Sequence, residues 1–144
     1  MKFKVTHIFV ILFMFTALAG LAQPGQKDKV EALKISFITQ KINLTTQEAQ
    51  SFWPVYNEYS DKIKFARRSF RQQYGAVAEF KSDKEAEDYL NAELKLKQTE
   101  LELNKEYTEK FKKILGSKKA ALLRLAEEEF KKEIIKTIKG NTTE

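Results

Sequence analysis

Beyond residue 28, hydrophobic side chains recur at intervals of three and four residues, which is the period of an amphipathic α-helix. The pattern predicts a first helix from about Val30 to Ile42, which Asn43 and Leu44 bring to an end. A second helix is then expected to begin near Thr46, and it carries most of the aromatic residues that follow.

The start of the second helix is marked by a capping box. Thr45 is followed three residues later by Glu48, so each side chain can accept a hydrogen bond from the other residue's backbone amide. The helix is expected to fray near Gly75 or to run to about Phe80. Pro54 lies inside it, where its ring removes a backbone hydrogen bond, and predicts a kink or a break into two pieces.

A third helix is predicted from a second capping box at residues 82–85 to about residue 115, a length of about 50 Å. Its hydrophobic positions form two adjacent stripes, and a face that broad must contact more than one neighbour. One stripe consists of Leu90, Leu94, Leu101 and Leu115, and the other consists of Tyr89, Leu96, Leu103, Tyr107, Phe111 and Ile114. We expect a second copy of the chain to cover the remaining face, which predicts a homodimer.

Gly116 and Ser117 are expected to turn the chain into a fourth helix, which ends at Gly140 and Asn141. The predicted fold is therefore all-α: an elongated antiparallel helical hairpin or bundle of about four helices with short connections. A single all-helical domain is expected at 29–140. A flexible lead-in at 23–28 precedes it, and a disordered tail at 141–144 follows it.

The first 22 residues have the pattern of a cleavable signal peptide. Lys2 and Lys4 precede an uncharged apolar run, and small residues follow this run up to Ala22. The competing interpretation is an uncleaved membrane anchor, for which the apolar run is short. We expect cleavage after Ala22 and a soluble protein outside the cytoplasm, without a lipid anchor because no cysteine is present.

Composition narrows the chemistry further. The single histidine and both methionines lie in the predicted signal peptide, whose removal also lowers the formal net charge from +6 to +4. The mature chain then lacks the nitrogen and sulfur ligands of transition metals, and it has no loop of calcium-binding spacing. No set of nucleophile, base and oxyanion donors can be assembled. We therefore expect no enzyme, no catalytic or metal site, no cofactor, no small-molecule substrate and no nucleic acid partner.

Leu44, Thr45 and Glu48 open the second predicted helix, and an aromatic segment follows at 52–56. Together with the signal peptide, these residues resemble the Spy/CpxP family of small exported helical proteins, which is marked by two Leu-Thr-x-x-Gln motifs. Residues 38–59 are most similar to the branch labelled sensor of an extracytoplasmic-function (ECF) sigma factor. The resemblance implies a cradle-shaped homodimer in the periplasm. For the best-understood members it also implies ATP-independent binding of unfolded envelope proteins.

The chain departs from the family motif in both copies. The first copy has Glu48 where the motif has glutamine, which still permits a capping box. The second copy begins at Leu115 and has Gly116 for the threonine and Lys119 for the glutamine, with Ser117 as the capping residue. We expect this second copy to keep little beyond its leucine.

The second helix offers one candidate client-binding surface. Lys64, Arg67, Arg68 and Arg71 lie on one flank, with no acidic residue four positions away, and Phe65 lies on the opposite side. Positive charge beside apolar area suits the capture of unfolded chains. Alternatively, the bases are solvated or pair with acidic residues of the neighbouring helix, for which the candidates are Glu87, Asp88 and Glu93.

Three functions remain open from the sequence. The leading one is an envelope-stress protein that acts as an ATP-independent periplasmic chaperone, with unfolded or misfolded envelope proteins as partners. The second is an extracytoplasmic regulator that docks on a membrane signalling protein controlling an ECF sigma factor or a sensor kinase. The third is a structural module with neither activity.

Overall fold

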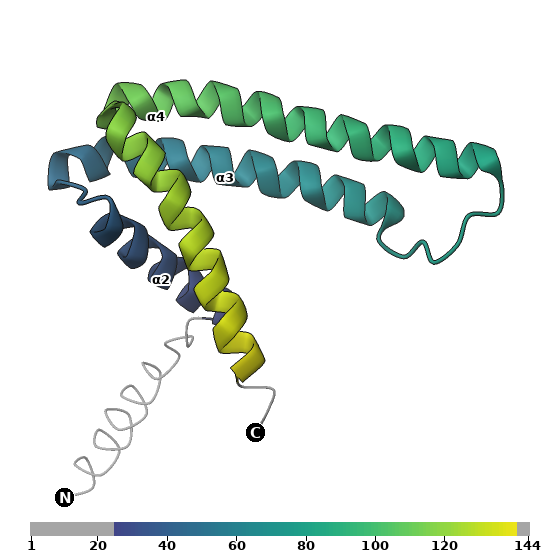
Figure 1. The fold of residues 1–144 in the computed structure, drawn as a ribbon, viewed down its shortest axis with the longest axis horizontal. Coiled ribbons are helices and arrows are strands. Elements are labelled where there is room, and N and C mark those ends of the chain that lie inside the picture. The colour runs from purple at the N-terminus through teal and green to yellow at the C-terminus, as the bar shows by residue number, and fades with distance from the viewer. Residues whose placement is uncertain (1–24, 141–144) are drawn as a thin grey trace, which may run out of the picture. The chain divides into compact units, whose positions relative to one another are not determined.

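The computed structural model describes residues 25–140, where the chain forms three helices and no strand: α2 (Gln26–Lys41), α3 (Thr46–Tyr74) and α4 (Asp83–Gly140) (Figure 1). The all-α prediction is confirmed for these residues. The expected signal peptide at 1–22 and tail at 141–144 lie outside the described residues. The chain divides into two compact units between Lys34 and Ile35.

Of the first unit, the structure describes residues 25–34, which are helical from the start of α2. This helix begins at Gln26, inside the stretch expected to be a flexible lead-in. The reason is local, because the Gly25 amide donates a hydrogen bond to the Asp28 carboxylate at 3.0 Å. Asp28 also places negative charge in the first turn, where the helix dipole favours it.

The second unit begins within α2 and includes the rest of the described chain. Ile38 and Ile42 are fully buried in its core. After them the backbone turns through Asn43, which has a φ of 49°, and the Leu44 amide donates to the Thr39 carbonyl at 3.0 Å. This turn places Thr45 at the N-cap of α3.

Helix α3 begins with the capping box that the sequence predicts. The Glu48 amide donates to the Thr45 hydroxyl at 3.2 Å, and the Thr45 amide donates to the Glu48 carboxylate at 2.8 Å. The helix continues through Pro54 to Tyr74, so the predicted alternative of a break into two pieces is wrong. Pro54 is exposed, and water can therefore reach the carbonyl that it leaves without a partner. Gly75 caps the end of the helix.

Helix α4 is interrupted by one non-helical residue, Gly116, which has φ 76° and ψ 160°. The expected turn at Gly116 into a further helix lies at this kink: residues 83–115 and 117–140 are helical on either side of it, and the label α4 covers both. We call them the first arm and the second arm of α4. Figure 1 shows the first arm running antiparallel to α3, and the second arm folding back toward the start of α3.

The core of the second unit is formed by one side of α3, both arms of α4 and the end of α2. Its largest fully buried side chains are Tyr56, Tyr107, Phe52, Phe111, Ile38, Ile42 and Leu123. The two predicted stripes of the first arm have different surroundings. Tyr107 and Phe111 pack against the aromatic residues of α3, whereas Leu90, Leu94 and Leu101 remain 55%, 62% and 53% exposed.

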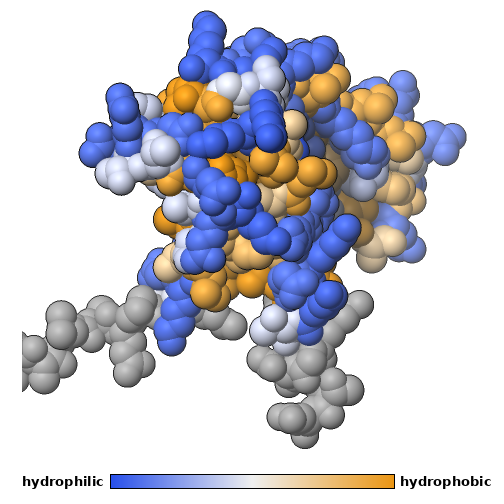
Figure 2. All heavy atoms as spheres, turned by 60° about the vertical axis from the view of Figure 1, so that its left-hand side comes forward, coloured by the Kyte–Doolittle hydropathy of each residue, from blue (hydrophilic) through white to orange (hydrophobic). Residues whose placement is uncertain are grey.

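Hydrophobic side chains are also visible at the surface in Figure 2, in gaps between hydrophilic ones. Over residues 25–140, no helix has an apolar stretch long enough to cross a membrane. The exposed hydrophobic residues of the second unit are candidates for contacts with a partner.

Candidate functional site

The two motif copies meet in space. Glu48 is the last residue of the first copy and Lys119 the last residue of the second, and the Lys119 ammonium donates to the two Glu48 carboxylate oxygens at 2.6 and 2.9 Å. It also donates to the Asn43 carbonyl at 2.8 Å. The expectation that the second copy keeps little beyond its leucine is therefore wrong, because its lysine is complementary to the glutamate of the first copy.

The leucines and the capping residues of the two copies have different environments. Leu115 is buried in the core, and Leu44 is half-buried against it. Thr45 forms the cap described above, whereas Ser117 is exposed at the start of the second arm. Both leucines therefore anchor their motif copies to the same core.

A polar cluster also ties the second arm to the rest of the unit. The Arg124 guanidinium donates to the Tyr59 hydroxyl at 3.2 Å, to Glu127 at 3.2 Å and to the Thr108 hydroxyl at 3.1 Å. The Tyr59 hydroxyl in turn donates to Asn104 at 2.6 Å. Because these residues come from α3 and from both arms of α4, the cluster fixes how the three segments pack.

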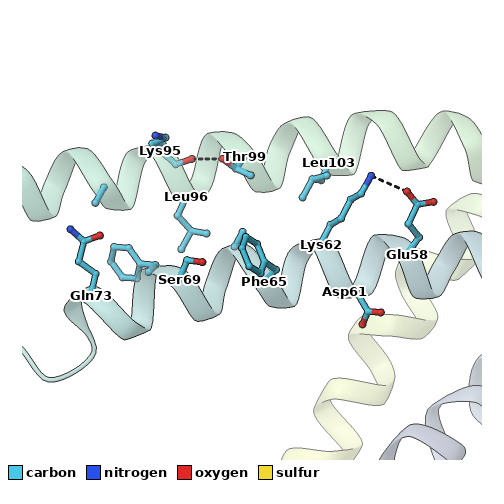
Figure 3. Close-up of a pocket in the computed structure, with 13 residues that line it drawn as sticks. Glu58, Asp61, Lys62, Phe65, Ser69, Gln73, Lys95, Leu96, Thr99 and Leu103 are labelled. Carbon is cyan, nitrogen blue, oxygen red and sulfur yellow. Dashed lines mark hydrogen bonds and ion pairs between the residues drawn. The ribbon is translucent and has the colours of Figure 1, made fainter.

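A groove of about 830 Å³ opens between α3 and the first arm (Figure 3). Phe65 lies at its centre and is 73% exposed. In Figure 3, Leu96 and Leu103 reach from α4 toward α3. The full lining consists of Glu58, Asp61, Lys62, Phe65, Ala66, Ser69, Phe70, Gln73, Ala92, Lys95, Leu96, Thr99 and Leu103.

Small side chains explain why the two helices leave this groove open. Ala66 and Ser69 face it from α3, and Ala92 and Thr99 face it from the first arm. Each of them is too short to fill the space between the helices, so Phe65 has no covering neighbour among the described residues. Sequence reasoning missed the groove, because small residues on two helices leave a gap only in the register at which the helices pack.

Charged residues lie toward both ends of the groove. At one end, Glu58 and Lys62 form an ion pair at 2.9 Å, beside the buried ring of Tyr107. The Tyr107 hydroxyl makes no hydrogen bond of normal geometry within the described chain, but together with Lys62 it lowers the pKa of the Glu58 carboxyl to about 2. Glu58 therefore stays charged at neutral pH. Toward the other end lies Lys95, for which residues 25–140 provide no recorded ion pair.

The predicted basic flank lies away from this groove. Phe65 lines the groove, whereas Arg67 is two residues further, about 200° around the helix. Lys64 pairs at 3.7 Å with Asp61, which lies three positions away and not at the four-residue spacing that the prediction considered. Arg67 pairs with Glu100 of α4.

Neither Arg68 nor Arg71 has a recorded ion pair among residues 25–140. Two of the three acidic residues expected as alternative partners have other contacts, since Asp88 pairs with Lys84 and Glu93 with Lys97. The structure therefore separates the five candidate residues into one groove residue, two paired bases and two exposed arginines.

Within the described range, no three acidic, histidine or cysteine side chains are grouped closely enough to hold a metal ion. Comparison with known proteins gives no match, since no family model, no curated protein and no solved structure matches the chain.

Proposed function

We propose that the protein is an exported, ATP-independent chaperone of the periplasm that binds non-native envelope proteins. The observation that carries this proposal is the apolar groove in which Phe65 is 73% exposed. A large aromatic side chain exposed in an apolar groove is typical of a binding surface, because burying it in a complex removes apolar area from water. The signal-peptide pattern at 1–22 supports the location.

The exposed charges of α3 support weak binding that does not depend on the sequence of the client. Arg68 and Arg71 are exposed on α3, and exposed charges attract oppositely charged chains over a distance of about one Debye length. Apolar contacts in the groove would then hold a client without requiring one fixed sequence. This combination suits a chaperone better than a site for one small molecule.

The proposal includes membership of the Spy/CpxP family and assembly as a homodimer. The capping box at Thr45 and the contact between the two motif copies support the family. The exposed stripe formed by Leu90, Leu94 and Leu101 supports the homodimer, because a second copy would remove this apolar area from water.

The test uses the mature chain, residues 23–144, mixed with a chemically denatured client whose aggregation is followed by light scattering. We expect suppression at a several-fold excess of the protein, and weaker suppression at high salt. Phe65→Ala should reduce suppression, whereas Leu125→Ala, which truncates a residue 66% exposed on the second arm, should not. If the wild-type chain leaves aggregation unchanged, the chaperone function is wrong and the regulator of a membrane signalling protein becomes the better proposal.

A second comparison tests the basic flank. Arg68 and Arg71 are the suitable positions for charge reversal, because Arg67 also holds α3 to α4 through Glu100. Arg68→Glu with Arg71→Glu should slow client capture at low salt and leave helicity unchanged. Equal capture by the variant and the wild type would show that the flank plays no part.

A further inference from the structure

We infer that the groove binds its clients as an amphipathic helix of about four turns, rather than as an extended segment; this inference rests on the proposed function. The groove runs along α3 from Glu58 to Gln73, which is about 22 Å at roughly 1.5 Å per residue. A helix of that length would lie along both walls.

Both walls of the groove have the spacing of a coiled-coil seam. Of the five lining residues on the first arm, Ala92, Leu96, Thr99 and Leu103 are spaced at intervals of four, three and four, and Lys95 lies next to Leu96. Of the eight lining residues on α3, Glu58, Lys62, Phe65 and Ser69 have the same spacing. Two helices with this repeat present ridges and holes to a third helix, whose side chains repeat with the same period.

An extended segment does not fit this arrangement as well. Its side chains alternate from one face to the other every residue, so they match a repeat of three and four poorly. Its backbone groups would also need partners, and helical walls have their own backbone groups already paired. A helix satisfies its backbone internally and uses one apolar stripe, which is the known mode of helix-in-groove recognition.

The charges of the groove favour one direction for the bound helix. Figure 3 shows Asp61 and Lys95 toward opposite ends of the groove, with Glu58 and its ion-pair partner Lys62 toward the Asp61 end. The lining residues Glu58, Asp61 and Lys62 together carry a formal charge of −1 at that end, and Lys95 carries +1 at the other. A helix carries partial positive charge at its N-terminus and partial negative charge at its C-terminus. The favoured direction therefore places the N-terminus of the client near Asp61 and its C-terminus near Lys95, parallel to α3.

The experiment uses labelled peptides of about 16 residues, which is close to four turns. The first peptide has leucine at heptad a and d positions, lysine near its N-terminus and glutamate near its C-terminus. The second has the same sequence with two central prolines, and the third has the charged ends exchanged. Fluorescence anisotropy measures affinity for the mature wild-type protein, and circular dichroism measures the helicity gained on binding.

We expect the first peptide to bind with a gain in helicity, and at least about tenfold more tightly than the proline peptide, which cannot form the helix. Phe65→Ala should weaken its binding about tenfold, as for a central aromatic contact, while Leu125→Ala should leave it unchanged. Lys95→Glu should remove the preference for the first peptide over the third. Lys105→Glu, at an exposed residue outside the groove on the same arm, should preserve that preference.

Two results would overturn the inference. Equal affinity for the helical and proline peptides would show that the groove binds extended chain, and no binding of any peptide would exclude the groove as the client site. In both cases the aggregation assay still decides the proposed function separately. Helical binding that Phe65→Ala abolishes, without any suppression of aggregation, would support the groove and overturn the chaperone function instead.

Discussion

Gly116 determines whether α4 is one straight rod or two arms, and replacing it with alanine tests this directly. The residue has φ 76° and ψ 160°, a backbone region that side chains with a Cβ atom rarely adopt. The space around it is open, because an added Cβ would have no atom of the described residues within 4 Å, its two chain neighbours apart. The cost of Gly116→Ala therefore comes from the backbone alone, without a steric clash.

The sign of the change in stability on Gly116→Ala distinguishes a kinked α4 from a straight one. In a continuous helix, replacing glycine with alanine stabilises a protein by about 1 kcal/mol. In the observed conformation, holding alanine in this region costs about 1 to 3 kcal/mol. The expected change is therefore a loss of stability, which corresponds to a fall in melting temperature of roughly 4 °C for each kcal/mol.

The assay is urea unfolding of the mature protein, followed by circular dichroism at one fixed protein concentration. Ala121→Gly provides the matched control, because Ala121 is an exposed helical residue of the second arm, where glycine should cost about 1 kcal/mol. Destabilisation by both substitutions supports the kink. Stabilisation by Gly116→Ala would refute it and would show that residues 83–140 form a straight helix.

Further predictions concern the motif contact and the leucine stripe. Glu48→Lys and Lys119→Glu should each lower the urea midpoint, and the double variant should recover part of the loss; purely additive losses would contradict a coupled pair. Lys119 and Thr45 lower the pKa of the Glu48 carboxyl in the folded protein. The stabilisation that the ionised carboxylate gives to the fold should therefore be complete above the ordinary pKa of 4.5, and it should be lost as the pH falls through the lower pKa of the folded state. Acid unfolding should therefore shift in Glu48→Gln, and identical curves would contradict this. Thr45→Ala should cost about 1 kcal/mol in urea unfolding, and no change would argue against the cap. Leu94→Glu with Leu101→Glu should convert a dimer to a monomer in sedimentation, whereas a monomeric wild type at micromolar concentration would contradict the dimer.

Local patterns in the sequence predicted most of the helix boundaries. The capping box at Thr45 and Glu48 needs only two residues at a fixed spacing, and it forms as expected. The effect of Pro54 was predicted less well, because it depends on whether the surroundings can satisfy the carbonyl that the proline leaves free, as well as on the clash of the ring with that carbonyl. At an exposed position water can do so, and exposure is a property of the packed structure.

The candidate site could be predicted only in part, because it depends on pairs of residues far apart in the chain. Phe65 was predicted to lie on the side opposite the basic flank, but the groove also requires small residues on α4 at the level of Phe65. The pairing of Arg67 with Glu100 likewise depends on the register of two antiparallel helices. A search at helical spacing finds partners within one helix, and it cannot fix the register between two helices.

The contact between Glu48 and Lys119 shows why the two motif copies must be considered together. Both residues lie where the motif of the proposed family has glutamine, and they carry opposite charges. In space they form an ion pair at 2.6 Å, so each charge compensates for the other. The Gly116 kink directs the second arm so that Lys119 reaches Glu48, and Glu48 also closes the capping box with Thr45. The kink, the ion pair and the cap therefore depend on one another, and a substitution at any of them should destabilise the start of α3.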